Sequence, residues 1–116
     1  MNMSNDVMRF LTACDQSPSK VNAELYKKLI AEEFTEFHDA IDAHDEIETL
    51  DACMDMIWVI LGYAHMKGYK VDAAWAEVAR SNLAKIDNKT GKVIKRHDGK
   101  VLKPEGWTPP DLTLYV

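Results

Sequence analysis

The sequence predicts an all-α fold: an antiparallel helix bundle of about four helices with a short C-terminal hairpin or extended arm. Apolar residues recur at three- and four-residue steps through most of residues 5–86, and short polar connections separate these stretches. After about residue 86, turn-forming and basic residues replace that pattern. At 116 residues, the chain (1–116) is expected to form one domain, with a helical core at about 5–86 and a basic arm at about 87–116.

The first two helices are predicted at about residues 5–13 and 20–43. The break Ser17-Pro18-Ser19 separates them, and its serine suits an N-cap. One row of the long helix is expected to be buried and comprises Tyr26, Ile30, Phe34, Phe37 and Ile41. A second row begins with apolar residues and continues with acids: Val21, Leu25, Leu29, Glu33 and Glu36.

The third helix is predicted from an N-cap at Asp45 to about Met66. From residue 52 to residue 64 it is apolar on every side, and its only charge is Asp55. A helix without a polar face is normally buried. Because a lone buried carboxylate is costly unless a cation, a metal or several donors satisfy it, Asp55 needs a partner. Asp51 lies one turn earlier on the same helix.

The fourth helix is expected from Ala73 to about Ile86, with Asp72 as its cap. Its inner side is predicted to carry Trp75, Val78, Ala79 and Leu83. Turn signals surround residues 93–94 and 101–102, which predicts a small hairpin or an ordered arm.

Four acids on the second and third helices are the strongest chemical signal. Because the connection at residues 43–45 is short, the two helices should be antiparallel neighbours. Glu33 and Glu36 then lie at about the same height as Asp51 and Asp55, so the four carboxylates should face one another. An all-oxygen donor set is typical of Mg²⁺ or Mn²⁺. Other helical acids are interpreted as a solvated face: Asp39, Asp42, Glu46 and Glu48.

Other metal chemistry finds little support. A ferritin-like di-iron site needs Glu-x-x-His pairs, and none of the four histidines follows a glutamate at that spacing. The two cysteines form no disulfide framework or zinc-ligand spacing.

Asn82 and Lys85 lie one turn apart at the end of the fourth helix, where a lysine either binds an anion or simply favours the helix dipole.

The charge is unevenly distributed along the chain. Residues 1–84 carry 15 acids and 7 bases, and residues 85–116 carry 4 acids and 7 bases. An acidic body with a basic tail suits a site for metal and phosphate, or a tail that pairs with its own body. The net charge of −5 disfavours a general nucleic-acid binder, although a basic arm that binds nucleic acid stays an alternative. We expect a cytoplasmic protein without a signal peptide or membrane span, and one that self-associates because it is small.

Taken together, the motifs resemble those of the all-α nucleotide pyrophosphohydrolases, in particular the MazG-like, phosphoribosyl-ATP pyrophosphohydrolase-like branch. The resemblance covers roughly residues 24–112. It is carried by Glu32-Glu33-Phe-Thr-Glu36, Asp51-x-x-x-Asp55, Ser81-Asn82-x-x-Lys85, Asp98-Gly-Lys-Val-Leu-Lys103-Pro and Pro109-Pro110-Asp111-Leu112.

This resemblance implies a homo-oligomer, dimeric or tetrameric, that hydrolyses a nucleoside triphosphate to the monophosphate and pyrophosphate. The cofactor would be Mg²⁺, with Mn²⁺ as an alternative. By motif position, Glu33, Glu36, Asp51 and Asp55 would bind the metal, and either Glu32 or Glu36 would act as the catalytic base. The substrate phosphates would be bound by Asn82, Lys85 and Lys103.

One position departs from the family pattern. The common second motif has a glutamate three residues before its aspartate, and this chain has Ala52 there. Asp51 would have to replace it. The departure motivates an alternative function, a non-catalytic nucleotide-binding or regulatory assembly module on the same fold.

Overall fold

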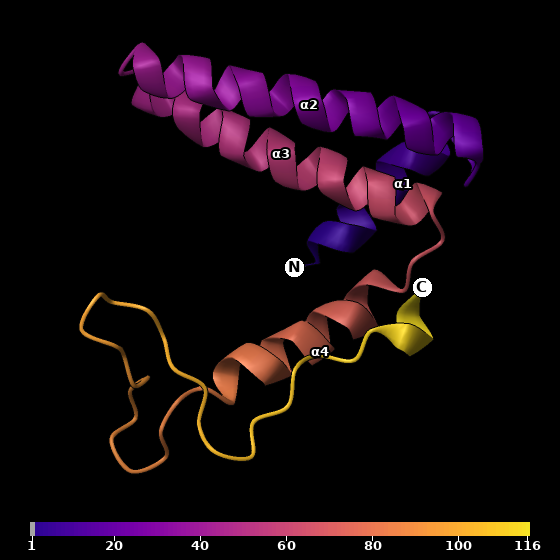
Figure 1. The fold of residues 1–116 in the computed structure, drawn as a ribbon. Coiled ribbons are helices and arrows are strands. Elements are labelled where there is room, and N and C mark those ends of the chain that lie inside the picture. The colour runs from indigo at the N-terminus through magenta and orange to yellow at the C-terminus, as the bar shows by residue number, and fades with distance from the viewer. Residues whose placement is uncertain (1) are drawn as a thin grey trace. The chain divides into compact units, whose positions relative to one another are not determined.

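The structure, a computed structural model, describes residues 2–116 and is all-helical over this range, which confirms the predicted fold class (Figure 1). Its elements are α1 (Met3–Ala13), α2 (Lys20–Asp42), α3 (Glu46–Met66), α4 (Val71–Leu83) and the short 3-10 helix η1 (Thr113–Tyr115). No helix among the described residues is long and apolar enough to cross a membrane.

The chain divides into two compact units, one ending at Val71 and the other running from Asp72 to Val116. The first unit holds α1, α2 and α3. The second holds nearly all of α4, the arm and η1. That residues 1–116 act as a single domain stays a prediction, and Met1 lies outside the described residues.

The helix starts follow from local capping. Ser19 caps α2 by accepting a hydrogen bond from the Asn22 backbone N–H at 3.0 Å, and Asp45 caps α3 in the same way from Glu48 at 3.1 Å. The prediction that Asp72 caps α4 was wrong, because the helix already begins at Val71. Asp72 instead lies in the first turn, where a carboxylate still favours the helix dipole.

In the first unit, α2 and α3 are antiparallel neighbours that lie side by side along their length (Figure 1). A close contact between Tyr26 and Gly62 fixes their spacing. A Cβ built on Gly62 would lie 2.5 Å from Cε1 of Tyr26, so only glycine leaves room for this ring. The Tyr26 hydroxyl donates a hydrogen bond to Oε1 of Gln16 at 2.7 Å.

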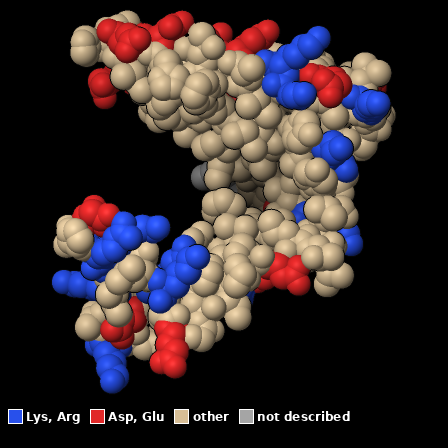
Figure 2. Space-filling model, viewed as in Figure 1, with Lys and Arg blue, Asp and Glu red and all other residues tan. Residues whose placement is uncertain are grey.

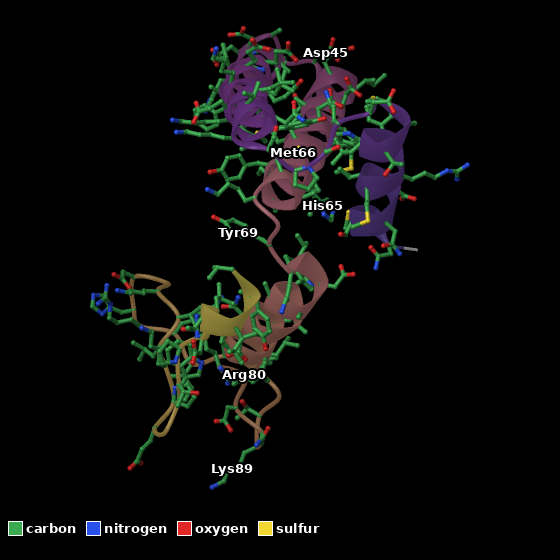
Figure 3. All side chains as sticks on the ribbon, turned by 90° about the vertical axis from the view of Figure 1, so that its right-hand side faces the viewer. Asp45, His65, Met66, Tyr69, Arg80 and Lys89 are labelled. Carbon is green, nitrogen blue, oxygen red and sulfur yellow. The ribbon has the colours of Figure 1, made fainter. Side chains whose placement is uncertain are left out.

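Helix α1 covers one end of the α2–α3 pair. Val7 and Leu11 of α1 are buried against this pair, and Oγ of Ser4 lies 3.0 Å from Nε2 of His65 near the end of α3 (Figure 3). The core cluster therefore lies near the start of α2 and the end of α3, and consists of Val7, Leu11, Ala23, Tyr26, Val59 and Met66.

Two burial predictions were wrong in this unit. Phe34 is 56% exposed and Ile41 is 43% exposed, although their row was expected to be buried. Helix α3 was expected to be buried on every side, yet Met54 and Ile60 are half exposed. The physical reason is that α2 and α3 pack against each other and α1 covers only part of them, so three helices leave the remaining sides of α2 and α3 open to solvent.

The second unit is built from α4 and the arm that follows it. Trp75 (73% exposed) and Leu83 (63% exposed) do not form the predicted inner side, whereas Val78 and Ala79 are partly buried. In the arm, two isolated antiparallel bridges pair Ile86 with Val93 and Lys95 with Val101.

Arg80 and Glu77 of α4 hold the C-terminal tail of the same unit. Arg80, labelled in Figure 3, forms an ion pair with Glu77, and Glu77 accepts a hydrogen bond from the backbone N–H of Asp111 at 2.9 Å. Arg80 also donates to the carbonyl oxygens of Thr108 and Pro109 at 3.4 Å.

Candidate functional site

Four acids on α2 and α3 form one electrostatic site in the first unit. Glu33 and Glu36 lie one turn apart on α2, and Asp51 and Asp55 lie one turn apart on α3. Glu33 and Asp55 are partly buried, and Glu36 and Asp51 are exposed. Each helix therefore offers one carboxylate in the interface and one at its edge.

The pKa values of the two partly buried acids report how close the four groups are. Burial raises the pKa of Glu33 to about 7, assisted by a hydrogen bond with Glu36 and by the negative charges of Glu36, Asp55 and Asp51. Burial also raises the pKa of Asp55, assisted by Asp51 and Glu36. The antiparallel pair thus brings the four acids within electrostatic range of one another, as their heights along the helices indicated.

No described side chain neutralises this cluster. Oε2 of Glu33 is buried and has no hydrogen-bond partner. The ion pairs found among residues 2–116 are Arg80–Glu77 and Arg96–Asp98, both in the second unit. A buried carboxylate oxygen without a donor is uncommon, because desolvation then goes uncompensated. The site is short of positive charge.

The donor set fits a hard divalent cation in its chemistry, because it consists only of carboxylate oxygens. Within the described part of the chain, however, no three His, Cys, Asp or Glu residues are arranged to hold a metal ion. The two observations are compatible because electrostatic interaction and metal coordination act over different distances. Charges act over roughly 8–10 Å, whereas a ligand must approach a magnesium ion to about 2 Å. Coordination of a cation by three or more of these acids would therefore require their side chains to move closer to one another.

Glu32, the other candidate base, is exposed on α2. It is not among the groups that raise the pKa of Glu33 or Asp55. Of the two candidate bases, Glu36 is therefore the one that interacts with the acidic site in this structure.

The three predicted phosphate-binding residues come together in the second unit. Lys85 donates a hydrogen bond from Nζ to Oδ1 of Asn82 at 3.2 Å. The Nζ atoms of Lys85 and Lys103 lie 5.2 and 4.9 Å from the ring centroid of Trp107. The indole N–H of Trp107 donates to the carbonyl oxygen of Ser81 at 2.6 Å, which ties the ring to α4.

Sequence reasoning did not connect Trp107 with the predicted phosphate-binding residues. The spacing of Lys103 and Trp107 is the one signal that links them in the sequence, and it does not reveal that Lys85 meets the same ring. Figure 2 shows Asp and Glu side chains along the outer edge of the α2–α3 pair near its turn, and Lys and Arg side chains gathered on the C-terminal arm.

A model of the family described as phosphoribosyl-ATP pyrophosphohydrolase matches residues 6–82. The matched segment includes all four acids and Asn82, and it ends before Lys85, Lys103 and Trp107. No curated protein matches the chain. Because the match spans well over half of the chain, the protein belongs to the phosphoribosyl-ATP pyrophosphohydrolase family, within the MazG-like all-α NTP pyrophosphatase superfamily.

Proposed function

We propose that this protein is a Mg²⁺-dependent pyrophosphohydrolase that cleaves a nucleoside triphosphate, or a related nucleotide, to the monophosphate and pyrophosphate. Family membership supports the reaction class, a pyrophosphohydrolase. The observation that carries the metal dependence is the buried, unpartnered Oε2 of Glu33 beside three further carboxylates. Mn²⁺ would be accepted in place of Mg²⁺, because both prefer oxygen ligands.

Glu33, Glu36, Asp51 and Asp55 would hold the metal. When bound, it would polarise phosphoryl oxygens and lower the pKa of a coordinated water. Because burial and neighbouring acids raise the pKa of Glu33 to about 7, metal must compete with a proton at this carboxylate. Turnover should therefore increase as the pH rises toward and past neutrality.

The remaining roles are proton transfer from the attacking water and binding of the phosphate groups. Glu36 or Glu32 accepts the proton of the attacking water. Asn82, Lys85 and Lys103 donate hydrogen bonds to phosphate oxygens, and the two lysines offset the charge that develops on the departing pyrophosphate.

A homo-oligomer, dimeric or tetrameric, is part of the proposal. Apolar side chains near the α2–α3 turn lie in water in the single chain, including Ile47 (81% exposed) and Leu50 (62% exposed). Exposed apolar side chains of this kind favour association with a second copy.

The second candidate function is a nucleotide-binding module without catalysis. Ala52 is buried and Asp51 is exposed, so the acid that replaces the usual glutamate points to a different side of α3. A site that has a shorter acid, one position away, in place of this glutamate favours binding over turnover.

A nucleotide panel separates the two functions. Ribo- and deoxynucleoside triphosphates and phosphoribosyl-ATP are incubated with the chain and Mg²⁺ or Mn²⁺, and pyrophosphate release is measured. The enzyme proposal expects metal-dependent release from at least one nucleotide. Tight nucleotide binding without product across the panel would favour the binding module.

Asp55→Asn tests the assignment of the site. The amide keeps the shape of the side chain and removes its charge, so turnover should fall about 100-fold, equivalent to about 3 kcal/mol of lost transition-state stabilisation. Asp39→Asn makes the same chemical change at an acid of α2 that is interpreted as part of the solvated face. It is the matched control and should leave turnover unchanged. Undiminished release by Asp55→Asn, measured on folded protein, would contradict the assignment.

A further inference from the structure

Trp107 lies outside the segment that the family model matches, yet it contacts more of the predicted phosphate-binding residues than any motif residue does. Its ring is anchored at one point, because the indole N–H is bonded to the Ser81 carbonyl oxygen on α4. Ser81 itself is buried at 2% exposure. The ring is therefore fixed to a buried position of α4.

Two ammonium groups lie against this one ring. Lys85 reaches it from the end of α4, and Lys103 reaches it from the arm. A tryptophan face attracts cations through its quadrupole, so the ring holds both groups despite their mutual repulsion. The result is a pair of positive charges whose spacing is set by Trp107.

These two lysines have no acidic partner among the described residues. Both arginines of the second unit do: Arg80 pairs with Glu77, and Arg96 pairs with Asp98. The unit thus neutralises its arginines internally and leaves Lys85 and Lys103, which contact the same ring, without an acidic partner among the described residues. Two cations on one ring, one of which donates a hydrogen bond to the Asn82 amide oxygen, match an anion that carries charge on two linked phosphoryl groups.

We infer that Trp107 is a positioning residue that holds Lys85 and Lys103 together as a clamp for a pyrophosphoryl group, so that the chain binds inorganic pyrophosphate. Trp107 itself acts through the two lysines. The inference rests on the proposed function and deepens it, because inorganic pyrophosphate is the product which that reaction would release.

The test measures pyrophosphate binding to the full chain by titration calorimetry in EDTA, so that no metal bridges the ligand to the acidic site. Wild type should bind pyrophosphate at least ten-fold more tightly than orthophosphate, since only the former engages both lysines. Trp107→Ala should weaken pyrophosphate binding about ten-fold, which corresponds to the loss of two cation–π contacts. Trp107→Phe keeps an aromatic face but loses the N–H that anchors the ring to Ser81, so its affinity for pyrophosphate should fall between that of wild type and that of Trp107→Ala.

Two controls separate positioning from folding. Trp75→Ala removes an exposed indole of α4 and should leave the dissociation constant unchanged. Lys103→Met removes one ammonium group, keeps an apolar stem and should weaken binding as much as Trp107→Ala. If Trp107 acts through the lysines, the double variant Trp107→Ala/Lys103→Met should lose less than the product of the two single effects.

The inference is overturned if Trp107→Ala binds pyrophosphate as wild type does, or if the phenylalanine variant loses as much as the alanine variant. It is also overturned if the double variant shows fully independent losses. Should Trp107→Ala fail to fold, the orthophosphate comparison and Lys103→Met decide alone. Pyrophosphate binding that depends on Trp107, in a chain that hydrolyses no nucleotide, would remove the proposed function and leave this inference standing.

Discussion

The acidic site on α2 and α3 and the lysine pair on Trp107 gather like charges in opposite ways. The acids lie partly inside a helix interface, where burial raises the pKa of Glu33 to about 7 and favours its protonated form. Lys85 lies just after the end of α4 and Lys103 lies on the arm, and an aromatic face holds both exposed lysines in contact with water. The difference indicates that the acidic site lowers the stability of the fold when no cation is bound, whereas the exposed basic cluster affects stability little.

Gly62→Ala is expected to have the largest effect, because it should disturb the helix pair that carries the acidic site. The new Cβ would lie 2.5 Å from the Tyr26 ring, so α2 and α3 must separate or the ring must leave the core. We expect a loss of about 2–3 kcal/mol in unfolding free energy, even though alanine favours a helix over glycine. Denaturant unfolding followed by circular dichroism measures it.

The same variant should also uncouple the acids. If the helices separate, burial of Glu33 decreases and its pKa should move back toward its ordinary value, which NMR titration of the side-chain carboxyl would detect. An unchanged stability together with an unchanged pKa would mean that the Tyr26–Gly62 contact does not set the helix spacing.

Much of the acidic site was predictable because it depends on local rules. The caps at Ser19 and Asp45 fix where α2 and α3 begin, and a short connection then forces them to be antiparallel neighbours. With both helices in place, a rise of about 1.5 Å per residue brings Glu33 level with Asp55. Each step uses residues that are near one another in sequence.

The features that sequence reasoning missed depend on contacts between distant segments. Hydrophobic periodicity marks Phe34 and Ile41 as inward-facing but does not reveal that α1 stops short of them. Likewise, Lys85 and Trp107 lie 22 positions apart in the sequence, and no turn or periodicity rule predicts that an arm folds back onto a helix over that distance. The division into two units could not be predicted from the sequence either, because the apolar periodicity continues through α4.

The second prediction concerns how the stability of the metal-free protein depends on pH through Glu33. Unfolded Glu33 ionises near its ordinary value of 4.5, while the folded form keeps its proton to about pH 7. Glu33 therefore stabilises the fold fully below about pH 4.5, and this contribution is lost as the pH rises through 7. We expect about 1 kcal/mol less stability at pH 8 than at pH 5 from this residue in metal-free protein, because the exposed neighbours Glu36 and Asp51 are screened by solvent.

Thermal unfolding with and without EDTA measures this effect. Glu33→Gln removes the titrating group, so its difference from wild type isolates the contribution of Glu33 to the pH dependence of stability. Mg²⁺ added at pH 8 should raise the melting temperature of wild type more than that of the variant. A wild type whose stability runs parallel to that of Glu33→Gln from pH 5 to pH 8 would rule out the raised pKa.

The smallest expected effect concerns the basic side, where Glu77 holds the tail through Arg80 and the backbone N–H of Asp111. These partners lower the pKa of Glu77, so its contribution is present at neutral pH and is lost only in acid. Glu77→Gln should speed hydrogen exchange at the Asp111 amide by a few-fold, with Glu105→Gln as the control from the same unit. Pyrophosphate binding in EDTA should persist, because Trp107 is anchored separately through Ser81. If binding instead falls as far as in Trp107→Ala, then this exposed ion pair, and not the aromatic ring, keeps the two lysines together.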